Sequence, residues 1–185
     1  KEYILDNDSI TKNAEGKKYI RFLADTLKPY VDSVYRTKPE REFTGIGGSS
    51  LGGLISIYSG FLYPEVYSKL LIFSPSLWVN PENNFPQMNF KNPYEIKVYM
   101  YGGEMEGSQM TERIALFEKT LESWENSHSI QFEFKISIND EGKHQEFYWS
   151  QEFPRAVEWL FYNTQEDTKE LAKKALIIQS ETSTK

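Results

Sequence analysis

The segment Gly48-Ser49-Ser50-Leu51-Gly52 constrains the fold of this chain more than any other stretch of its sequence. It has the pattern G-x-S-x-G and lies between a β-prone run and an apolar run long enough for a helix. In that context the pattern is typical of a nucleophilic serine on a sharp strand-to-helix turn at the edge of an α/β sheet. Such a turn strains the serine backbone and brings strand and helix close together, so side chains at the flanking glycines would clash.

The spacing of the glycines decides between two adjacent serines. Ser50 has a glycine two positions before it and another two positions after it, whereas the residue two positions after Ser49 is Leu51. Ser50 is therefore the predicted nucleophile. A Gly-Ser cluster can also form an ordinary turn, but the flanks favour the functional interpretation. They predict a strand over residues 42–46 and, from apolar residues at helical spacing, a helix over residues 51–62.

The rest of the chain alternates between helix-like and strand-like patterns. A helix is expected over residues 15–35, kinked or split at Pro29. Short apolar or alternating runs predict strands over residues 69–73, 96–101 and 130–138, and amphipathic patterns predict helices over residues 108–126 and 146–162. Residues 1–14 and 80–93 read as loops. We expect one α/β domain over residues 1–163, with a mostly parallel sheet and helices on both faces, and a helical tail over residues 164–185.

Composition excludes several classes of protein. The 185 residues suffice for one domain with a sizeable core, and 39% hydrophobic and 15% aromatic residues indicate a globular chain. A net charge of −6 without a basic stripe argues against a nucleic-acid partner. No apolar run reaches the ~18 residues that a membrane span needs. The absence of cysteine excludes thiolate chemistry, and only two histidines make a metal site unexpected, so no cofactor is predicted. The compartment, cytoplasmic or periplasmic, stays open.

Candidate side chains follow three of the predicted strands. In open α/β sheets, active groups gather beyond the carboxyl ends of the strands. Ser50 follows the first strand, Glu104 and Glu106 follow the third, and His144 follows the fourth. A serine needs an adjacent base, and imidazole titrates in the right range. His144 is the predicted base because it lies in a loop, whereas His128 lies at the end of a helix and is read as solvated.

The sequence identifies the acid that orients the histidine, and the groups that bind the oxyanion, less closely than it identifies the nucleophile and the base. Glu106 and Glu104 compete with Asp140 and Glu141, which lie near His144 in the sequence. One oxyanion donor should be the backbone N–H of Leu51, the residue after the nucleophile. The second normally comes from a loop after an earlier strand, but no convincing strand precedes residue 17.

From about residue 17 to residue 161 the sequence resembles the putative-esterase family of α/β hydrolases, which includes esterase D, siderophore trilactone esterases, and feruloyl and acetyl-xylan esterases. The resemblance rests on four stretches beside the region before the nucleophile strand: Thr44-Gly45-Ile46-Gly47-Gly48-Ser49-Ser50-Leu51-Gly52-Gly53-Leu54, Phe73-Ser74-Pro75-Ser76-Leu77-Trp78, Tyr101-Gly102-Gly103-Glu104-Met105-Glu106-Gly107 and Gly142-Lys143-His144-Gln145-Glu146-Phe147-Tyr148-Trp149. It implies an α/β-hydrolase fold with Ser50 as nucleophile, His144 as base and Glu106 as acid.

The resemblance also implies a function, and this chain differs from the family pattern in one respect. It predicts a serine hydrolase that cleaves a small-molecule carboxylic ester through an acyl-enzyme, in the manner of siderophore or carbohydrate esterases. The family's N-terminal strands have no counterpart here, so a missing N-terminal segment or a partner chain is expected to complete the sheet. Two alternatives follow: a hydrolase-like module that binds a ligand without catalysis, or an acyltransferase.

Overall fold

The computed structural model describes residues 15–79, 94–107, 109–125 and 130–162. The loops predicted over residues 1–14 and 80–93, the tail predicted over residues 164–185, and His128 lie outside these residues.

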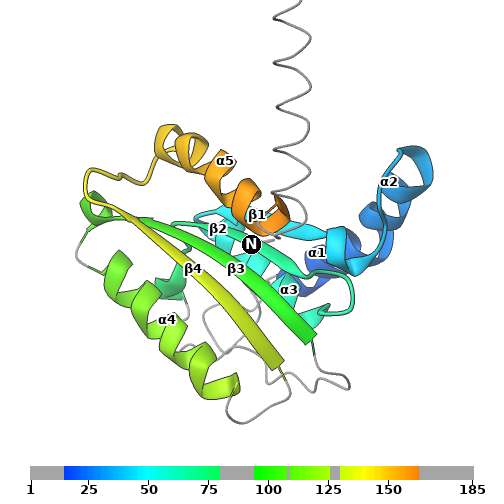
Figure 1. Ribbon diagram of the computed structural model, residues 1–185, viewed down its shortest axis with the longest axis horizontal. Helices are drawn as coiled ribbons and strands as arrows, with labels where there is room; N and C mark the ends of the chain where they lie inside the picture. Colours follow the sequence, from blue (N-terminus) through cyan, green and yellow to red (C-terminus); the bar gives the residue numbers. More distant parts are fainter. Residues whose placement is uncertain (1–14, 80–93, 108, 126–129, 163–185) are drawn as a thin grey trace, which may run out of the picture.

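The core of the fold is a sheet of four parallel strands in the order β1-β2-β3-β4 (Figure 1). The strands are β1 (Gly45–Ser49), β2 (Lys69–Phe73), β3 (Tyr94–Gly103) and β4 (Ile130–Asn139). The alternating helices are α3 (Leu51–Leu62), α4 (Met110–Glu125) and α5 (Glu146–Tyr162). Because each strand is followed by a crossover, neighbouring strands run in the same direction and all their carboxyl ends meet at one edge. The predicted parallel α/β architecture is confirmed.

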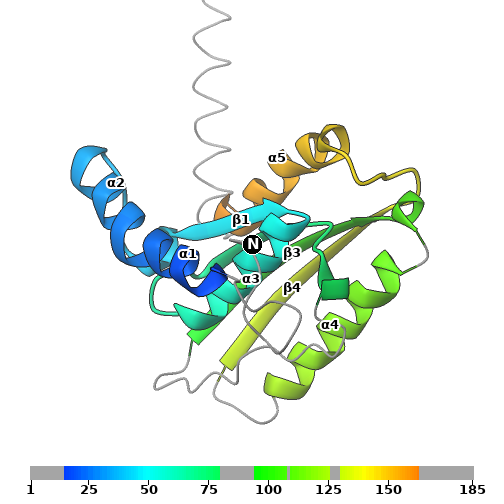
Figure 2. The same cartoon turned by 180° about the vertical axis from the view of Figure 1, so that it is seen from behind.

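Helices cover both faces of the sheet, as expected (Figures 1 and 2). On one face α3 and α4 bury a large apolar core against the strands, and Phe132, Phe134 and Ile136 of β4 pack against that core. On the other face α5 packs Ala156 and Leu160 against β2 and β3. Two apolar residues that helical spacing predicts to face the core do not do so: Phe153 of α5 is 52% exposed and Leu116 of α4 is 49% exposed. Both fit an apolar helical stripe, but nothing in the described residues packs far enough over them to bury them.

Strand β1 begins three residues later than predicted. Residues Arg41–Phe43 form a 3-10 turn, in which Thr44 N–H donates to the Arg41 carbonyl at 2.9 Å. The strand itself is rich in glycine, which strand propensity disfavours. Packing outweighs propensity here, because a Cβ at Gly47 would lie 2.6 Å from Leu71 Cβ. No described strand pairs with the other edge of β1.

The N-terminal helical region is split before Pro29, as predicted. It consists of α1 (Gly16–Phe22), a π-helical turn (Leu23–Leu27) and α2 (Lys28–Val34). A wider turn accommodates the proline, whose ring would clash with the carbonyl four residues earlier and which has no N–H to donate. The apolar side chains of Phe22, Leu27, Tyr30 and Val34 are exposed, and α2 buries none of its residues, since it projects beyond the β1 edge of the sheet (Figures 1 and 2).

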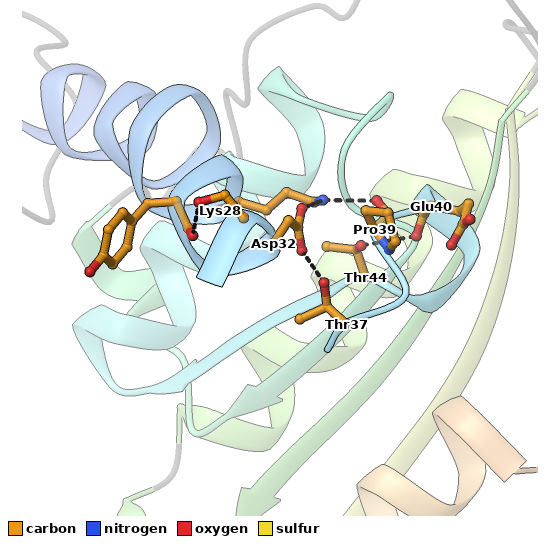
Figure 3. Close-up of polar contacts among 8 residues, drawn as sticks. Lys28, Asp32, Thr37, Pro39, Glu40 and Thr44 are labelled. Carbon is orange, nitrogen blue, oxygen red and sulfur yellow. Dashed lines mark hydrogen bonds and ion pairs between the residues drawn. The ribbon is translucent and has the colours of Figure 1, made fainter. Parts of the chain in front are cut away.

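Polar contacts tie α2 to the segment that leads into β1 (Figure 3). Lys28 Nζ donates to Asp32 Oδ2 at 2.5 Å and to the Pro39 carbonyl at 2.8 Å. Thr37 Oγ1 donates to Asp32 Oδ1 at 2.8 Å. The hydrogen bonds from Lys28 and Thr37 lower the pKa of Asp32. These contacts hold the connection in place without a hydrophobic core beneath it.

Three buried tyrosines make a prediction about alkaline stability. Burial raises the pKa values of Tyr67, Tyr99 and Tyr101 to about 12, from an ordinary value of 10.0. Between these values the unfolded chain loses protons first, so the free energy of unfolding should fall as pH rises from about 10 to 12. We expect ultraviolet absorbance to show a late phase of tyrosine ionisation that coincides with unfolding by circular dichroism.

The matched variant is Tyr101→Phe. The Tyr101 hydroxyl is buried and has no hydrogen-bond partner among the described residues, so its removal costs no hydrogen bond. The late phase should shrink in this variant while the fold persists at neutral pH. Ionisation of all tyrosines in one phase near pH 10, with the fold intact, would contradict the prediction.

Candidate active site

Ser50 occupies a strained turn between β1 and α3. Its φ is 56° and its ψ −122°, a region that side-chain-bearing residues rarely adopt and that is characteristic of functional sites. Ser50 N–H donates to the Phe73 carbonyl of β2 at 2.9 Å, which anchors the turn to the sheet. A Cβ at Gly48 would lie 2.7 Å from the backbone of Gly52, so the first glycine of the motif is required. A Cβ at Gly52 meets only open space, and there the predicted clash is wrong.

The Ser50 hydroxyl contacts another serine in this structure. Ser50 Oγ lies 3.2 Å from Oγ of the buried Ser76, whose N–H also donates to the Ser50 carbonyl at 3.0 Å. No hydrogen bond joins Ser50 Oγ to the His144 ring, both of which belong to the described part of the chain. The structure thus places Ser50 at the same sheet edge as the histidine without a hydrogen bond between them.

His144 and Glu106 form a pair. His144 Nδ1 lies 2.7 Å from Glu106 Oε2. A carboxylate oxygen only accepts, so Nδ1 is the donor in this pair and Nε2 is the ring nitrogen that does not face the carboxylate. The Glu106 side chain has no exposed surface, whereas that of His144 is 35% exposed. A buried carboxylate therefore holds one nitrogen of an imidazole that remains accessible from solvent.

Close backbone packing places His144 over Glu106. The loop after β4 lies against the end of β3, where Met105 N–H donates to the Gly142 carbonyl at 3.0 Å. A Cβ at Gly103 would lie 2.2 Å from that carbonyl oxygen, and a Cβ at Gly142 would lie 2.5 Å from the Tyr101 hydroxyl. Two glycines thus permit the approach that brings the ends of β3 and β4 together.

The other predicted acids lie differently. Glu104, Asp140 and Glu141 are exposed, and no hydrogen bond or ion pair joins any of them to the ring of His144. Leu51 begins α3, so its N–H has no acceptor within the helix, as an oxyanion donor requires. Across residues 15–79, 94–107, 109–125 and 130–162, no strand precedes β1 that could carry a second donor.

Sequence reasoning assigned Ser74 and Trp149 no role at the acid, although Ser74 contacts Glu106 directly and Trp149 contacts it through Ser74. Ser74 Oγ donates to Glu106 Oε1 at 2.6 Å, and Trp149 Nε1 donates to Ser74 Oγ at 2.8 Å. The Trp149 ring also packs edge-on against the His144 ring, with centroids 5.0 Å apart. Both lie in stretches that carry the family resemblance, but the sequence could not show that they meet Glu106, because residues 74, 106 and 149 come from separate elements.

Two grooves flank β1 and neither is lined by Ser50, Glu106 or His144. One, of about 1010 Å³, lies between the N-terminal helices and the β1 edge, and the other, of about 620 Å³, lies beneath α5. Among the described residues there is no cluster of three or more His, Asp or Glu side chains that could hold a metal ion. Nor does any described helix combine the length and apolarity of a membrane span.

The chain matches a known family and a curated sequence. The family described as "Putative esterase" matches residues 5–160. A curated relative, the uncharacterized protein YbbA of Bacillus subtilis, is 25% identical over 150 residues, which are 79% of this chain and 60% of YbbA.

Solved structures share the fold. The BES protein of Bacillus cereus is similar with a TM-score of 0.65 and 16% identity, over 87% of this chain and 62% of that protein. The enterobactin esterase FES of Shigella flexneri, in the presence of enterobactin, is similar with a TM-score of 0.61 and 17% identity, over 78% of this chain and 37% of FES. The chain therefore spans about three fifths of the length of YbbA and BES, and less of FES.

Proposed function

The chain belongs to the Putative esterase family, and on this premise we propose that it forms the catalytic part of a serine hydrolase that cleaves carboxylic esters. The observation that carries the proposal is the His144–Glu106 pair at 2.7 Å, at the same edge of the sheet as a serine held at a φ of 56°. Family membership supports ester hydrolysis, and the strained serine supports nucleophilic attack.

The proposed reaction proceeds in two steps. Ser50 Oγ attacks the ester carbonyl while its proton passes to His144 Nε2, and the alcohol leaves with that proton. Water then attacks the acyl-enzyme, with His144 accepting its proton and returning it to Ser50. Glu106 keeps the ring in the required tautomer and stabilises the imidazolium. For the attack, the Ser50 hydroxyl must exchange its contact with Ser76 for one with His144, since such contacts commonly tighten only when substrate binds.

The backbone N–H of Leu51 is the proposed first oxyanion donor. As the first residue of α3 it is free of intrahelical bonding, and it lies at the positive end of the helix dipole.

The substrate class that we propose is an ester with a ring-bearing group, as in siderophore or carbohydrate esters. Trp78 supports it, because this side chain is 47% exposed and its ring centroid lies 6.1 Å from that of His144. An exposed indole beside the reacting atoms offers a stacking surface for an aromatic or sugar ring. The net charge of −6 disfavours strongly anionic esters, although local charge matters more.

Covalent labelling with a fluorophosphonate probe tests this function. The probe phosphonylates only an activated serine, so intact-mass analysis should show a single adduct on the protein. We expect no adduct on Ser50→Ala. We expect a wild-type adduct on Ser49→Ala, because this substitution removes the neighbouring hydroxyl and leaves the proposed nucleophile unchanged. Absence of any adduct on the wild-type protein would contradict the proposal and favour a binding module without catalysis.

A further inference from the structure

Ser74 lies at the centre of a chain of hydrogen bonds that ends on the carboxylate of Glu106. It follows β2, it is fully buried, and its φ of 45° is the second strained backbone among the described non-glycine residues. Its N–H donates to the Tyr101 carbonyl of β3 at 2.8 Å, which holds the strained conformation in place. Strain of this kind persists where the surrounding structure requires the side chain to point in one direction.

The direction of the hydrogen bonds in this chain is determined by the chemistry of its two ends. The indole N–H of Trp149 can only donate, and the carboxylate of Glu106 can only accept. Ser74 Oγ therefore accepts a hydrogen bond from Trp149 at 2.8 Å and donates its single proton to Glu106 Oε1 at 2.6 Å. A hydroxyl that accepts one hydrogen bond donates the next one more strongly.

Glu106 is fully constrained by its donors. Oε1 accepts from Ser74 and from the backbone N–H of Gly103 at 2.8 Å, and Oε2 accepts from His144. Because Oε1 is held twice, the second oxygen points at the imidazole. The Trp149 ring, packed edge-on against the same imidazole, restricts its other side.

We infer that Ser74, polarised by Trp149, is the positioning residue that aims the Glu106 carboxylate at His144. This inference rests on the proposed function. It assigns no contact with substrate to Ser74, which acts through Glu106. Loss of the hydroxyl should leave the carboxylate free to rotate and weaken its hold on the ring.

Two substitutions separate this role from a contribution to folding. Ser74→Ala removes the hydroxyl and keeps the strain, whereas Ser74→Gly removes the hydroxyl and tolerates the positive φ. The matched control is Ser59→Ala, since Ser59 is equally buried but donates to the Ile55 carbonyl inside α3 at 2.8 Å. If Ser74 only supported the fold, the Ser74→Gly and Ser74→Ala variants would differ in both measurements below, because only the alanine variant keeps the backbone strain. In the proposed role the two variants behave alike.

The first measurement does not depend on activity. The proton on His144 Nδ1 should give a downfield proton resonance, identified by its loss in His144→Gln. We expect the resonance in the wild-type protein and in Ser59→Ala, and its loss through exchange with water in both Ser74 variants. An unchanged resonance in Ser74→Ala and Ser74→Gly would overturn the inference, whatever the outcome for the proposed function.

The second measurement is the rate of fluorophosphonate labelling. A hydrogen bond to a charged group contributes enough that both Ser74 variants should label about 10- to 100-fold more slowly, and Trp149→Phe more slowly by a smaller factor. In a Glu106→Ala background, a further Ser74→Ala change should have almost no effect. Wild-type labelling rates in both Ser74 variants would overturn the inference while leaving the proposed function standing, and an additive loss in the double variant would also overturn it.

Discussion

Replacing Glu106 with glutamine should lower kcat by about 10⁴-fold, with little change in KM. The substitution is isosteric but removes the negative charge that His144 Nδ1 contacts at 2.7 Å. The amide can present its NH₂ group to Nδ1, which favours the tautomer with its proton on Nε2, where it cannot accept the serine proton. Losses of about 10⁴ follow when the acid of a serine triad is neutralised in this way. Hydrolysis of a simple p-nitrophenyl ester provides the measurement.

The matched controls are the other acids that the sequence left open. Glu104→Gln changes an exposed carboxylate two residues away, and Asp140→Asn changes one in the loop that carries His144. Both should retain kcat within about threefold, as expected for surface positions without a partner in the site. A Glu106→Gln enzyme of near wild-type activity, with a large loss in either control, would reassign the acid.

Replacing Phe61 with alanine should cost about 3–5 kcal/mol of unfolding free energy, the range found for large aromatic side chains removed from cores. Phe61 is 1% exposed and lies at the centre of an aromatic cluster. Its ring centroid lies 6.3 Å from Phe117, 5.8 Å from Trp124 and 6.1 Å from Phe132. The cluster joins α3, α4 and β4, so a cavity there removes packing contacts among all three elements.

Urea denaturation followed by circular dichroism measures this loss. The control is Phe22→Ala on α1, where the side chain is 48% exposed and the expected change lies within about 0.5 kcal/mol. Equal losses in the two variants would show that the α3–α4 face is not the dominant core.

The nucleophile turn and the order of the elements were predictable because both depend on local pattern. Two glycines around Ser50, followed by apolar residues at helical spacing, predict a strand, a turn and a helix whatever the rest of the chain does. The start of β1 was not predictable, because its glycines are favourable only in tertiary contacts, where Gly47 lies against Leu71 of the next strand and Gly48 lies against Gly52 of α3.

By itself, the sequence determined the parallel α/β class, the predicted nucleophile and the set of carboxylates from which an acid could come. These follow from periodicity, glycine spacing and chain order, which need no knowledge of distant contacts. Only the tertiary structure decided which carboxylate lies against His144, and that Ser74 and Trp149 hold it. Residues 74, 106, 144 and 149 follow or begin four different elements, and their side chains meet only because parallel strands bring their carboxyl ends to one edge. Burial was likewise decided by tertiary structure. Phe153 and Leu116 fit an apolar helical pattern but are exposed, because burial depends on what packs over a helix and helical periodicity does not contain that information.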